Sequence, residues 1–304
     1  MKVIILIINY NNTNDLKKCI QSCLQLSFCD FQIVVIENGS RKEIIVENSN
    51  WIKNLELPKI KNEINLPFDK VKYIVTEKNL GFGNGNNFGF EWISKNFEKP
   101  NYIWLLNNDT ESDINALSNL VDAMEKNGSL GFAGSLILDF YQRNIIQAAG
   151  GEILPWFGVS RHLLKGKKKE SVKFDNLISD YQCGASILVR YSLIEQYGGF
   201  RPDYFLYFEE SDWQYRMNKI GWSNTLVATS MVYHKEGAST KNLPKHFYYH
   251  YFYSAIKFSR LNFQPIQNIT SMLSLILLLI LRSKFKYNLI KEGLRGIYFA
   301  LSKT

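Results

Sequence analysis

Short apolar runs alternate with helical patterns through the first half of the sequence, and this alternation constrains the fold more than any other feature. Residues 3–8, 31–36, 73–76 and 102–106 are typical of buried strands, and helices are predicted at 14–26, 83–96 and 112–126. Apolar strands separated by helices predict an α/β fold with a mainly parallel sheet that is covered on both faces. Ligands of such sheets bind in the crevice at the carboxyl ends of the strands.

The second half of the sequence is less regular. Strands are predicted at residues 132–138, 181–189 and 222–228, and a lysine-rich loop is predicted at 163–172. From residue 243 onward the pattern is helical and rich in Tyr, Phe, Leu and Ile. We therefore expect an α/β domain that is followed by a helical extension.

Composition narrows the function only slightly. The formal net charge of +8 on 304 residues suits a polyanionic ligand, an anionic membrane or nucleic acid equally well. Cys19 and Cys23 lie four residues apart on a predicted helix, which favours buried thiols in a reducing cytoplasm over a zinc site. The longest apolar run, residues 272–281, is shorter than the roughly 20 residues that cross a bilayer. We therefore expect that the chain does not span a membrane.

A polar cluster, Asn107-Asn108-Asp109, directly follows the strand predicted at 102–106. A hard cation that bridges two phosphates prefers carboxylate oxygen, and the end of a strand points into the ligand crevice. The alternative is that Asp109 caps the helix predicted after it, because Asp is favoured at that position.

His234 also follows a predicted strand. Its neutral imidazole could complete a coordination sphere that Asp109 opens. The alternative is an ordinary polar residue. His162, His246 and His250 have no comparable setting and are given no role.

Three carboxylates, those of Glu209, Glu210 and Asp212, lie close together after an aromatic segment. Burial and crowding raise the pKa of a carboxyl group, so Glu210 or a neighbour could be the general base that deprotonates an acceptor hydroxyl. The alternative is the acidic first turn of a helix, in which Asp212 pairs with Arg216.

A glycine-rich segment at 79–89 follows a strand and opens a helix, where backbone can approach a phosphate closely. It is not the dinucleotide fingerprint, because Asn86 stands at the third glycine position. An NAD-dependent oxidoreductase is therefore disfavoured and kept as an alternative.

In order and spacing, these motifs resemble glycosyltransferase family 2, with its GT-A fold, and particularly its rhamnosyltransferase-like branch of bacterial surface-polysaccharide and lipopolysaccharide synthesis. The resemblance runs from residue 3 to about residue 239. It is carried by segments 8–11, 36–40, 79–87, 107–109, 183–185, 198–200, 205–213 and 234–239. The chain departs from the family pattern where Glu37 and Glu210 replace Asp, and where Asp109 alone remains of the metal-motif carboxylates.

The resemblance implies a catalytic domain at 1–240, with a nucleotide-binding half at 1–110 and an acceptor half at 111–240, and a helical extension at 241–304. Glu210 is the implied catalytic base with Asp212 as the second candidate, and Asp109 and His234 are the implied ligands of Mg²⁺ or Mn²⁺. The residues expected at the nucleotide sugar are Asn9, Tyr10, Asn11, Glu37, Asn38, Asn79, Gly83, Asn84, Asn87, Asn108 and Asp109. Those expected at the acceptor are Gly184, Ala185, Glu209 and Trp213.

The implied reaction moves a sugar with inversion from a UDP- or dTDP-sugar, dTDP-rhamnose among them, to a hydroxyl of a lipid-linked or surface glycan. We expect a cytoplasmic protein that binds no nucleic acid and docks on the inner membrane face through residues 269–286. Alternatively, that segment packs on the catalytic domain or on a second subunit of a homodimer. A non-catalytic carbohydrate-binding protein is a further alternative. A sugar nucleotidyltransferase and a processive membrane synthase are disfavoured, because their Gly-x-Gly-Thr-Arg and Gln-x-x-Arg-Trp motifs do not occur in the sequence.

Overall fold

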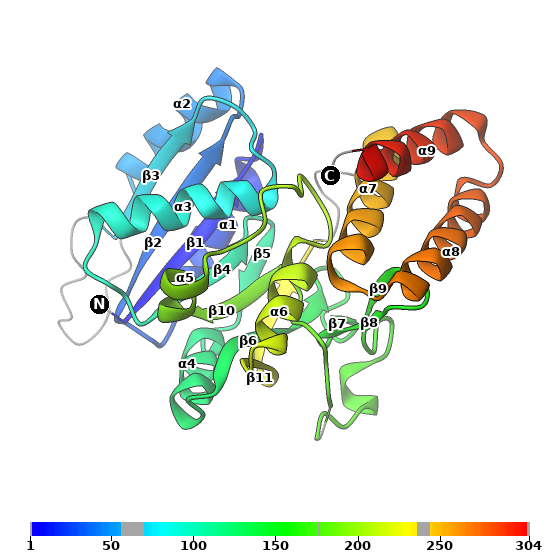
Figure 1. Ribbon diagram of the computed structural model, residues 1–304. Coiled ribbons are helices and arrows are strands. Elements are labelled where there is room, and N and C mark those ends of the chain that lie inside the picture. The colour runs from blue at the N-terminus through cyan, green and yellow to red at the C-terminus, as the bar shows by residue number, and fades with distance from the viewer. Residues whose placement is uncertain (1, 56–69, 176, 236–243, 303–304) are drawn as a thin grey trace.

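The computed structural model describes residues 2–55, 70–175, 177–235 and 244–302 of the chain (Figure 1). Within these residues, a nine-stranded sheet forms the centre of the molecule, and a two-stranded hairpin lies apart from it. Helices α7, α8 and α9 follow at the C-terminal end and stand together beside the hairpin (Figure 1).

The sheet is mainly parallel, as the alternation of strands and helices predicts. Strands β1 (Val3–Asn9), β2 (Phe31–Asn38), β3 (Val71–Thr76) and β4 (Tyr102–Asn107) pair in parallel in the order β3-β2-β1-β4. The sheet continues through β10 (Ser186–Arg190), β6 (Leu130–Asp139), β11 (Ser223–His234) and β5 (Thr110–Ser112), and β7 (Ile146–Ala148) pairs with β6. Strands β5, β7 and β10 run antiparallel to their neighbours, whereas β11 is parallel to β6. The carboxyl ends of β1, β2, β4 and β11 therefore meet at one edge.

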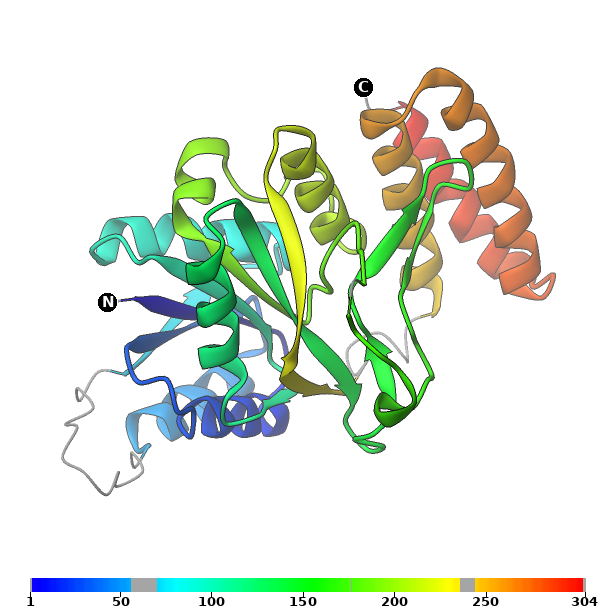
Figure 2. The ribbon, with the colours of Figure 1, turned by 90° about the horizontal axis from the view of Figure 1, so that it is seen from below.

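Helices cover both faces of the sheet, and each face has its own hydrophobic core. One face is packed by α1 (Asn14–Cys23), α2 (Lys42–Lys53) and α4 (Ala116–Lys126), and the other by α3 (Phe82–Asn96), α5 (Tyr191–Tyr197) and α6 (Glu209–Lys219). Figure 2 shows α3 and the blue helices α1 and α2 on opposite sides of the strands. Covered on both faces, the inner strands are apolar along their whole length, which explains their continuous hydrophobic runs.

Several boundaries differ from the sequence prediction, because short strands interrupt the expected elements. The helix predicted at 112–126 begins at Ala116, since residues 110–112 form β5. The strand predicted at 181–189 is reduced to β10, and the strand predicted at 222–228 extends to His234. The lysine-rich segment contains one 3₁₀ turn, Lys169–Ser171. The hairpin of β8 (Gly151–Leu154) and β9 (Val159–His162) has no periodic signal, because each strand has only four residues.

The C-terminal helices α7 (Pro244–Asn262), α8 (Pro265–Ser283) and α9 (Tyr287–Ser302) pack on the sheet domain through a third hydrophobic cluster. Phe252 and Phe258 of α7 join Leu275 of α8 in this cluster, together with Tyr204 and Phe208 from the loop before α6. The division of the chain at residue 240 stays a prediction.

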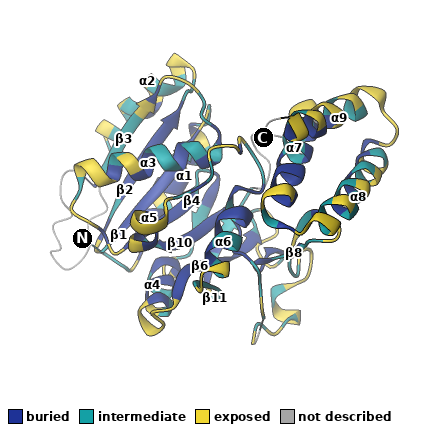
Figure 3. Ribbon diagram, viewed as in Figure 1, coloured by how far each residue is buried: buried dark blue, intermediate teal, exposed yellow. Residues whose placement is uncertain are grey.

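Helix α8 is longer than the apolar run that the sequence shows, and its outer face is exposed. At 1.5 Å per residue, 19 residues reach about 28 Å, so the helix is long and apolar enough to cross a membrane by length and composition. The sequence-based argument that it is too short is therefore wrong. One face is buried at Ser271, Leu275 and Leu279, where the Ser271 hydroxyl donates to the carbonyl oxygen of Pro155 at 2.7 Å. The opposite face exposes an apolar stripe, Ile269, Leu273, Leu277 and Leu281 (Figure 3).

Candidate active site

A cleft of about 440 Å³ lies at the edge where the carboxyl ends of the parallel strands meet. Polar residues from β1, β2 and β4 and their loops form one wall, and aromatic residues before α6 and in α7 form the other. The cleft is lined by Ile8, Tyr10, Asn38, Asn79, Gly81, Phe82, Asn107, Asn108, Asp109, Phe205, Leu206, Tyr207, His234, His246, Phe247 and His250. Six residues expected from the sequence are among them: Tyr10, Asn38, Asn79, Asn108, Asp109 and His234.

Asp109 and His234 are brought together by the pairing of β5 with β11. Thr110 lies opposite His234 in this antiparallel pair, so the preceding Asp109 reaches the end of β11. The Lys235 amide donates to the carbonyl oxygen of Asp109 at 3.1 Å, and Asp109 Oδ1 lies 3.2 Å from His234 Nε2. Because a strand follows Asp109, the alternative that it caps a helix is wrong.

Gln147 on β7 fixes the orientation of the His234 ring. Its Oε1 lies 2.5 Å from His234 Nδ1, and its Nε2 donates to the carbonyl oxygen of His234 at 3.3 Å. An amide oxygen can only accept, so Nδ1 carries a proton, and in the neutral ring the lone pair of Nε2 is on the side of Asp109. Gln147 is buried, and sequence reasoning missed it, since a lone Gln within a three-residue strand matches no motif.

The pair formed by Asp109 and His234 fits a divalent cation of the Mg²⁺ or Mn²⁺ type. Such ions commonly take one or two protein ligands and complete their shell with water and substrate phosphate oxygens. Among the described residues, no group of three or more His, Cys, Asp or Glu side chains is close enough to hold a metal by itself. A diphosphate in the cleft would therefore have to supply part of the coordination.

A buried polar network supports the cleft floor. Asn108 Nδ2 donates to Asn9 Oδ1 at 2.5 Å, and Asn9 Nδ2 donates to both carboxylate oxygens of Glu37 at 2.8 and 2.9 Å. Glu37 is fully buried and also accepts hydrogen bonds from Asn48, at 2.9 Å, and from the hydroxyl groups of Ser40 and Tyr73. Asn9 and Glu37 therefore lie beneath the cleft, where they position Asn108.

Three residues expected at the nucleotide sugar instead tie α3 to the loop before α6. Asn84 Nδ2 donates to the carbonyl oxygen of Pro202 at 3.0 Å, and Asn87 exchanges two hydrogen bonds with the backbone of Phe200, at 2.8 and 3.0 Å. Gly83 packs against Phe200, because an added Cβ would lie 3.2 Å from the Cβ of that residue. The glycine-rich segment thus connects α3 to the loop before α6. It also borders the cleft through Asn79 and Gly81.

The loops after β1 and β2 are also connected. Asn11 has a left-handed backbone with φ of 49°, and its Oδ1 accepts from the Arg41 amide at 2.9 Å. This contact uses the Asn11 side chain and leaves the neighbouring Tyr10, which is 41% exposed, as the residue that faces the cleft.

Glu210 lies in the first turn of α6, against the turn at Gly184. A Cβ added to Gly184 would lie 3.4 Å from Oε1 of Glu210, so the acceptor-side turn and the candidate base are in contact. Burial raises the pKa of Glu210 above its ordinary value, while backbone N–H groups at Glu210, Gly184 and Ser211 and the nearby His162 act in the opposite direction. Of the described residues, those lining the cleft do not include Glu210.

Glu209 and Trp213, which were predicted to contact the acceptor, are both buried. Glu209 is 2% exposed, and burial, followed by the charge of Glu210, raises its pKa well above the ordinary value. Trp213 is fully buried among Phe90, Phe132 and Phe200, so its predicted contact with an acceptor is wrong. Its indole ring is too large and too apolar to leave this core cheaply.

Asp212 is fully buried, and both of its carboxylate oxygens are already bound. Arg201 and Arg216 form ion pairs with it at 2.6 and 2.8 Å, and Asn262 of α7 donates to it at 2.8 Å. The helix pair of Asp212 with Arg216, the alternative considered from the sequence, is confirmed. These contacts hold Asp212 in the protein interior, whereas Glu210 is partly exposed.

The family model of glycosyl transferase family 2 matches residues 4–198 of the chain. The chain belongs to this family. An N-acetylglucosaminyl-diphospho-decaprenol L-rhamnosyltransferase of Mycobacterium tuberculosis is 24% identical to this family 2 member over 198 residues, which cover 58% of the chain and 62% of the relative. The chain thus spans less than two thirds of the length of that relative.

Solved glycosyltransferases share the fold of this family 2 member. The mannosyltransferase PcManGT from Pyrobaculum calidifontis, in complex with GDP-Man and Mn²⁺, aligns with a TM-score of 0.60 at 11% identity and covers 100% of this chain and 76% of its own. GalNAc-T7 with UDP, GalNAc and Mn²⁺ aligns with a TM-score of 0.61 at 17% identity and covers 99% and 58%. The predicted GT-A fold is confirmed.

Replacing Gln147 with Leu tests how the candidate metal site is oriented. Without the Gln147 oxygen, the His234 ring loses its fixed tautomer, and we expect the affinity for Mn²⁺ in the presence of UDP to fall about 10–100-fold. Titration followed by electron paramagnetic resonance measures free Mn²⁺ directly. Gln142→Leu, at an exposed position before the same strand, is the matched control. Equal Mn²⁺ affinity in both folded variants would contradict the role of Gln147.

Proposed function

We propose that this protein is an inverting glycosyltransferase that moves a sugar from a nucleoside-diphosphate donor to an acceptor hydroxyl. One observation carries the proposal: Asp109 Oδ1 and His234 Nε2 lie 3.2 Å apart and line a cleft of about 440 Å³ at the carboxyl edge of the sheet. Ligands of open α/β sheets bind at this edge. Neither an NAD-dependent oxidoreductase nor a non-catalytic carbohydrate-binding protein would require the contact between Asp109 and His234 in this cleft.

The difficult electrostatic step is departure of the nucleoside diphosphate, which gains negative charge as the glycosidic bond breaks. A bound Mg²⁺ or Mn²⁺ would supply stabilisation of that charge, which is worth several kcal/mol in a site shielded from water. Asp109 and His234 would hold the ion, and Gln147 would keep His234 in the ligating tautomer. Tyr10 at the open side of the cleft would pack against the base of the nucleotide, since aromatic rings stack on nucleobases readily.

Glu210 would take the proton from the acceptor hydroxyl. Its carboxylate is at the start of α6, against Gly184, and burial raises its pKa toward the range in which a general base works. Tyr207, three residues earlier, lines the cleft, so an acceptor that enters past this aromatic wall would approach the base. Attack from the face opposite the leaving diphosphate would give inversion.

The donor and acceptor are inferred from the relatives. The M. tuberculosis relative is named for L-rhamnosyl transfer to N-acetylglucosaminyl-diphospho-decaprenol. We therefore infer a dTDP- or UDP-sugar as donor, with dTDP-rhamnose as the first candidate, and a lipid-linked glycan with a diphosphate as acceptor. Such a reaction belongs to bacterial polysaccharide synthesis.

Donor turnover tests the proposed function directly. The protein with Mg²⁺ or Mn²⁺ should release a nucleoside diphosphate from one member of a panel of nucleotide sugars, and EDTA should stop the release. Asp109→Ala should reduce turnover to the level of EDTA-treated protein while its thermal unfolding temperature remains close to that of the wild type. Stabilisation by NAD without turnover of any nucleotide sugar would support the oxidoreductase instead.

The pH dependence of transfer identifies the base. Below its raised pKa Glu210 is protonated and cannot accept a proton, so kcat/KM should fall as the pH decreases, at a pH above the ordinary glutamate pKa of about 4.3. Glu210→Gln should lower transfer about 10²-fold or more and remove this acidic limb. Asp212→Asn should instead destabilise the fold, because Arg201 and Arg216 lose their buried partner. Loss of transfer by a stably folded Asp212→Asn variant, with Glu210→Gln active, would move the assignment to Asp212.

The exposed stripe on α8 supports a location on the inner membrane face. Its side chains are apolar and stand 54–61% exposed, and basic residues follow at Arg282, Lys284 and Lys286. Apolar groups gain about 0.8 kcal/mol per buried CH₂ in the lipid boundary, and each nearby cation adds about 1 kcal/mol against anionic lipid. Because the other face packs inside the protein, we infer that α8 lies in the plane of the membrane surface.

Vesicle flotation tests this location. Wild-type protein should float with anionic vesicles and be partly released at high salt, because salt screens the basic residues. Leu273→Glu with Leu277→Glu should abolish flotation and leave donor turnover intact. Ile178→Glu, at an apolar position that is 89% exposed elsewhere, is the matched control. Equal flotation of all three proteins would show that α8 is not the membrane-facing surface.

A further inference from the structure

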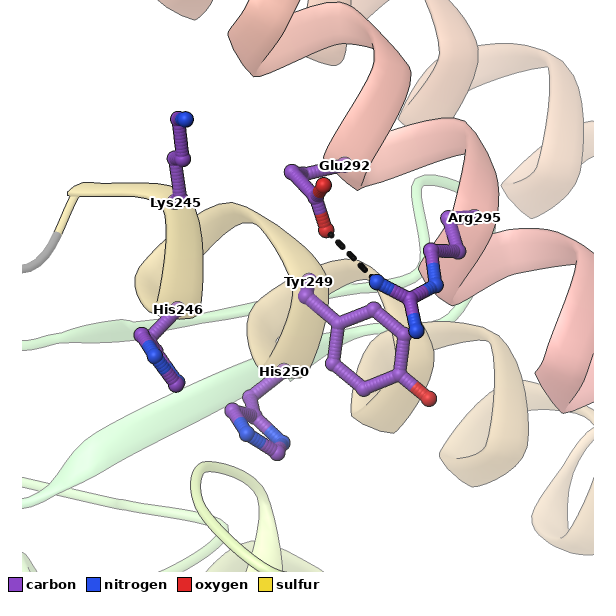
Figure 4. Close-up of a pocket in the computed structure, with 6 residues that line it drawn as sticks. All are labelled: Lys245, His246, Tyr249, His250, Glu292 and Arg295. Atoms are coloured by element: carbon purple, nitrogen blue, oxygen red, sulfur yellow. Dashed lines mark hydrogen bonds and ion pairs between the residues drawn. The ribbon is translucent and has the colours of Figure 1, made fainter.

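A second pocket, of about 410 Å³, opens between the first turns of α7 and the middle of α9 (Figure 4). It is lined by Lys245, His246, Tyr249, His250, Glu292 and Arg295. His246 and His250 also line the catalytic cleft, so the two spaces share a wall. The two imidazoles lie 6.2 Å apart at an angle of 20°, and His250 stacks on Phe205 of the cleft at 4.8 Å.

The charge of this pocket is positive on balance. Lys245 and Arg295 contribute two cations, whereas burial and the neighbouring His246 lower the pKa of His250 to about 4 and keep it neutral at pH 7. The carboxylate of Glu292 lies 3.4 Å from Arg295 Nη1 (Figure 4). The Arg295 guanidinium also lies 5.5 Å from the ring centroid of Tyr249 and 5.9 Å from that of Phe299. A guanidinium has five N–H donors, so one ion pair and two ring contacts leave Arg295 with donors for a second anion.

The pocket also lies at the positive end of a helix. Lys245 and His246 stand in the first turn of α7, which has 19 residues, so the helix dipole favours an anion at this end. Lys245 and Arg295 both line the pocket, and Figure 4 shows that they come from different helices, α7 and α9. Cations from two helices suit a group with several anionic oxygens better than a single carboxylate.

Exposed apolar side chains lie close to Arg295 along α9. Leu294 precedes Arg295, and Tyr298 follows it by one helical turn; these side chains are 47% and 65% exposed. Leu301, one further turn along, is 44% exposed. A ligand bound in the pocket would therefore have cations from two helices for its anionic group and exposed apolar side chains on α9 for an apolar group.

We propose that this pocket binds the diphosphate of an amphiphilic, lipid-linked acceptor, with Lys245 and Arg295 holding the phosphates and the α9 surface contacting the lipid. The inference rests on the proposed function and adds to it the place of the acceptor diphosphate. The shared wall of His246 and His250 puts a sugar attached to that diphosphate next to the catalytic cleft. The donor diphosphate, at Asp109 and His234, occupies the other side of the same wall.

Binding of farnesyl diphosphate tests the pocket without requiring transfer. The full-length protein is titrated with this prenyl diphosphate while saturating UDP and Mg²⁺ fill the donor site. Lys245→Ala with Arg295→Ala should weaken binding at least tenfold, because two charge-assisted contacts to phosphate are lost. Farnesol, which lacks the diphosphate, should bind equally weakly to wild type and variant. Lys291→Ala, an exposed cation on the same helix that does not line the pocket, is the matched control.

Three outcomes would overturn the proposal. The first is equal affinity of wild type and double variant for farnesyl diphosphate. The second is an equal loss of affinity in Lys291→Ala, which would indicate general attraction by a basic surface. The third is a double variant that binds farnesyl diphosphate normally but no longer floats with phosphatidylglycerol vesicles, which would make the pocket a phospholipid headgroup site.

Failure of this proposal can be separated from failure of the proposed function. If the protein turns over a donor sugar and the double variant still binds farnesyl diphosphate normally, the proposed transferase function stands. The proposal that the pocket binds the acceptor is then wrong. If the double variant binds farnesyl diphosphate weakly but the protein turns over no nucleotide sugar, the pocket is still a prenyl diphosphate site. The proposed transferase function is then wrong. The affinity for UDP, measured for every variant, reports that the donor side is still folded.

Discussion

The candidate active site depends on the pairing of a three-residue strand with the end of a twelve-residue strand. Strand β5 holds Asp109 beside His234 although the two residues are far apart in the sequence, and the Lys235 amide closes the contact on the carbonyl oxygen of Asp109. Without this pairing each residue would be a solitary polar group at the end of its strand. The contact between Asp109 and His234 therefore depends on the register of β11 against β5, because a shift by one residue turns His234 to the other face.

A second constraint joins the nucleotide side of the cleft to the side that carries Glu210. Gly81 has φ of 81°, and an added Cβ would lie 2.3 Å from the carbonyl oxygen of Phe205. The Phe82 amide donates to the same oxygen at 3.2 Å. With the amide contacts of Asn84 and Asn87, this makes the start of α3 and the loop before α6 one unit. Movement of one wall of the cleft must accordingly be accompanied by movement of the other.

The sequence predicted a mainly parallel sheet and the positions of the polar clusters, because strands buried on both faces leave a strong apolar pattern. It predicted Asp109 and His234 through their places after strands, but it could not show that β5 joins them, since three residues give no periodicity. Trp213 and Asn87 were assigned to ligands because motif position does not distinguish a residue that touches substrate from one that supports it. Gln147, His246 and His250 were missed for a related reason: only the fold brings Gln147 to His234 and the two histidines to the cleft.

The contact between Asp212 and Asn262 has a consequence for how the chain can be divided. Asp212 lies two residues after Glu210, and one of its hydrogen-bond donors comes from the last residue of α7. Tyr204 and Phe208, on the other side of the same turn, share a hydrophobic cluster with α7 and α8. The C-terminal helices are thus part of the support for α6 and the loop before it, and are not an interchangeable module. A chimera that exchanged them between relatives would have to exchange the loop before α6 as well.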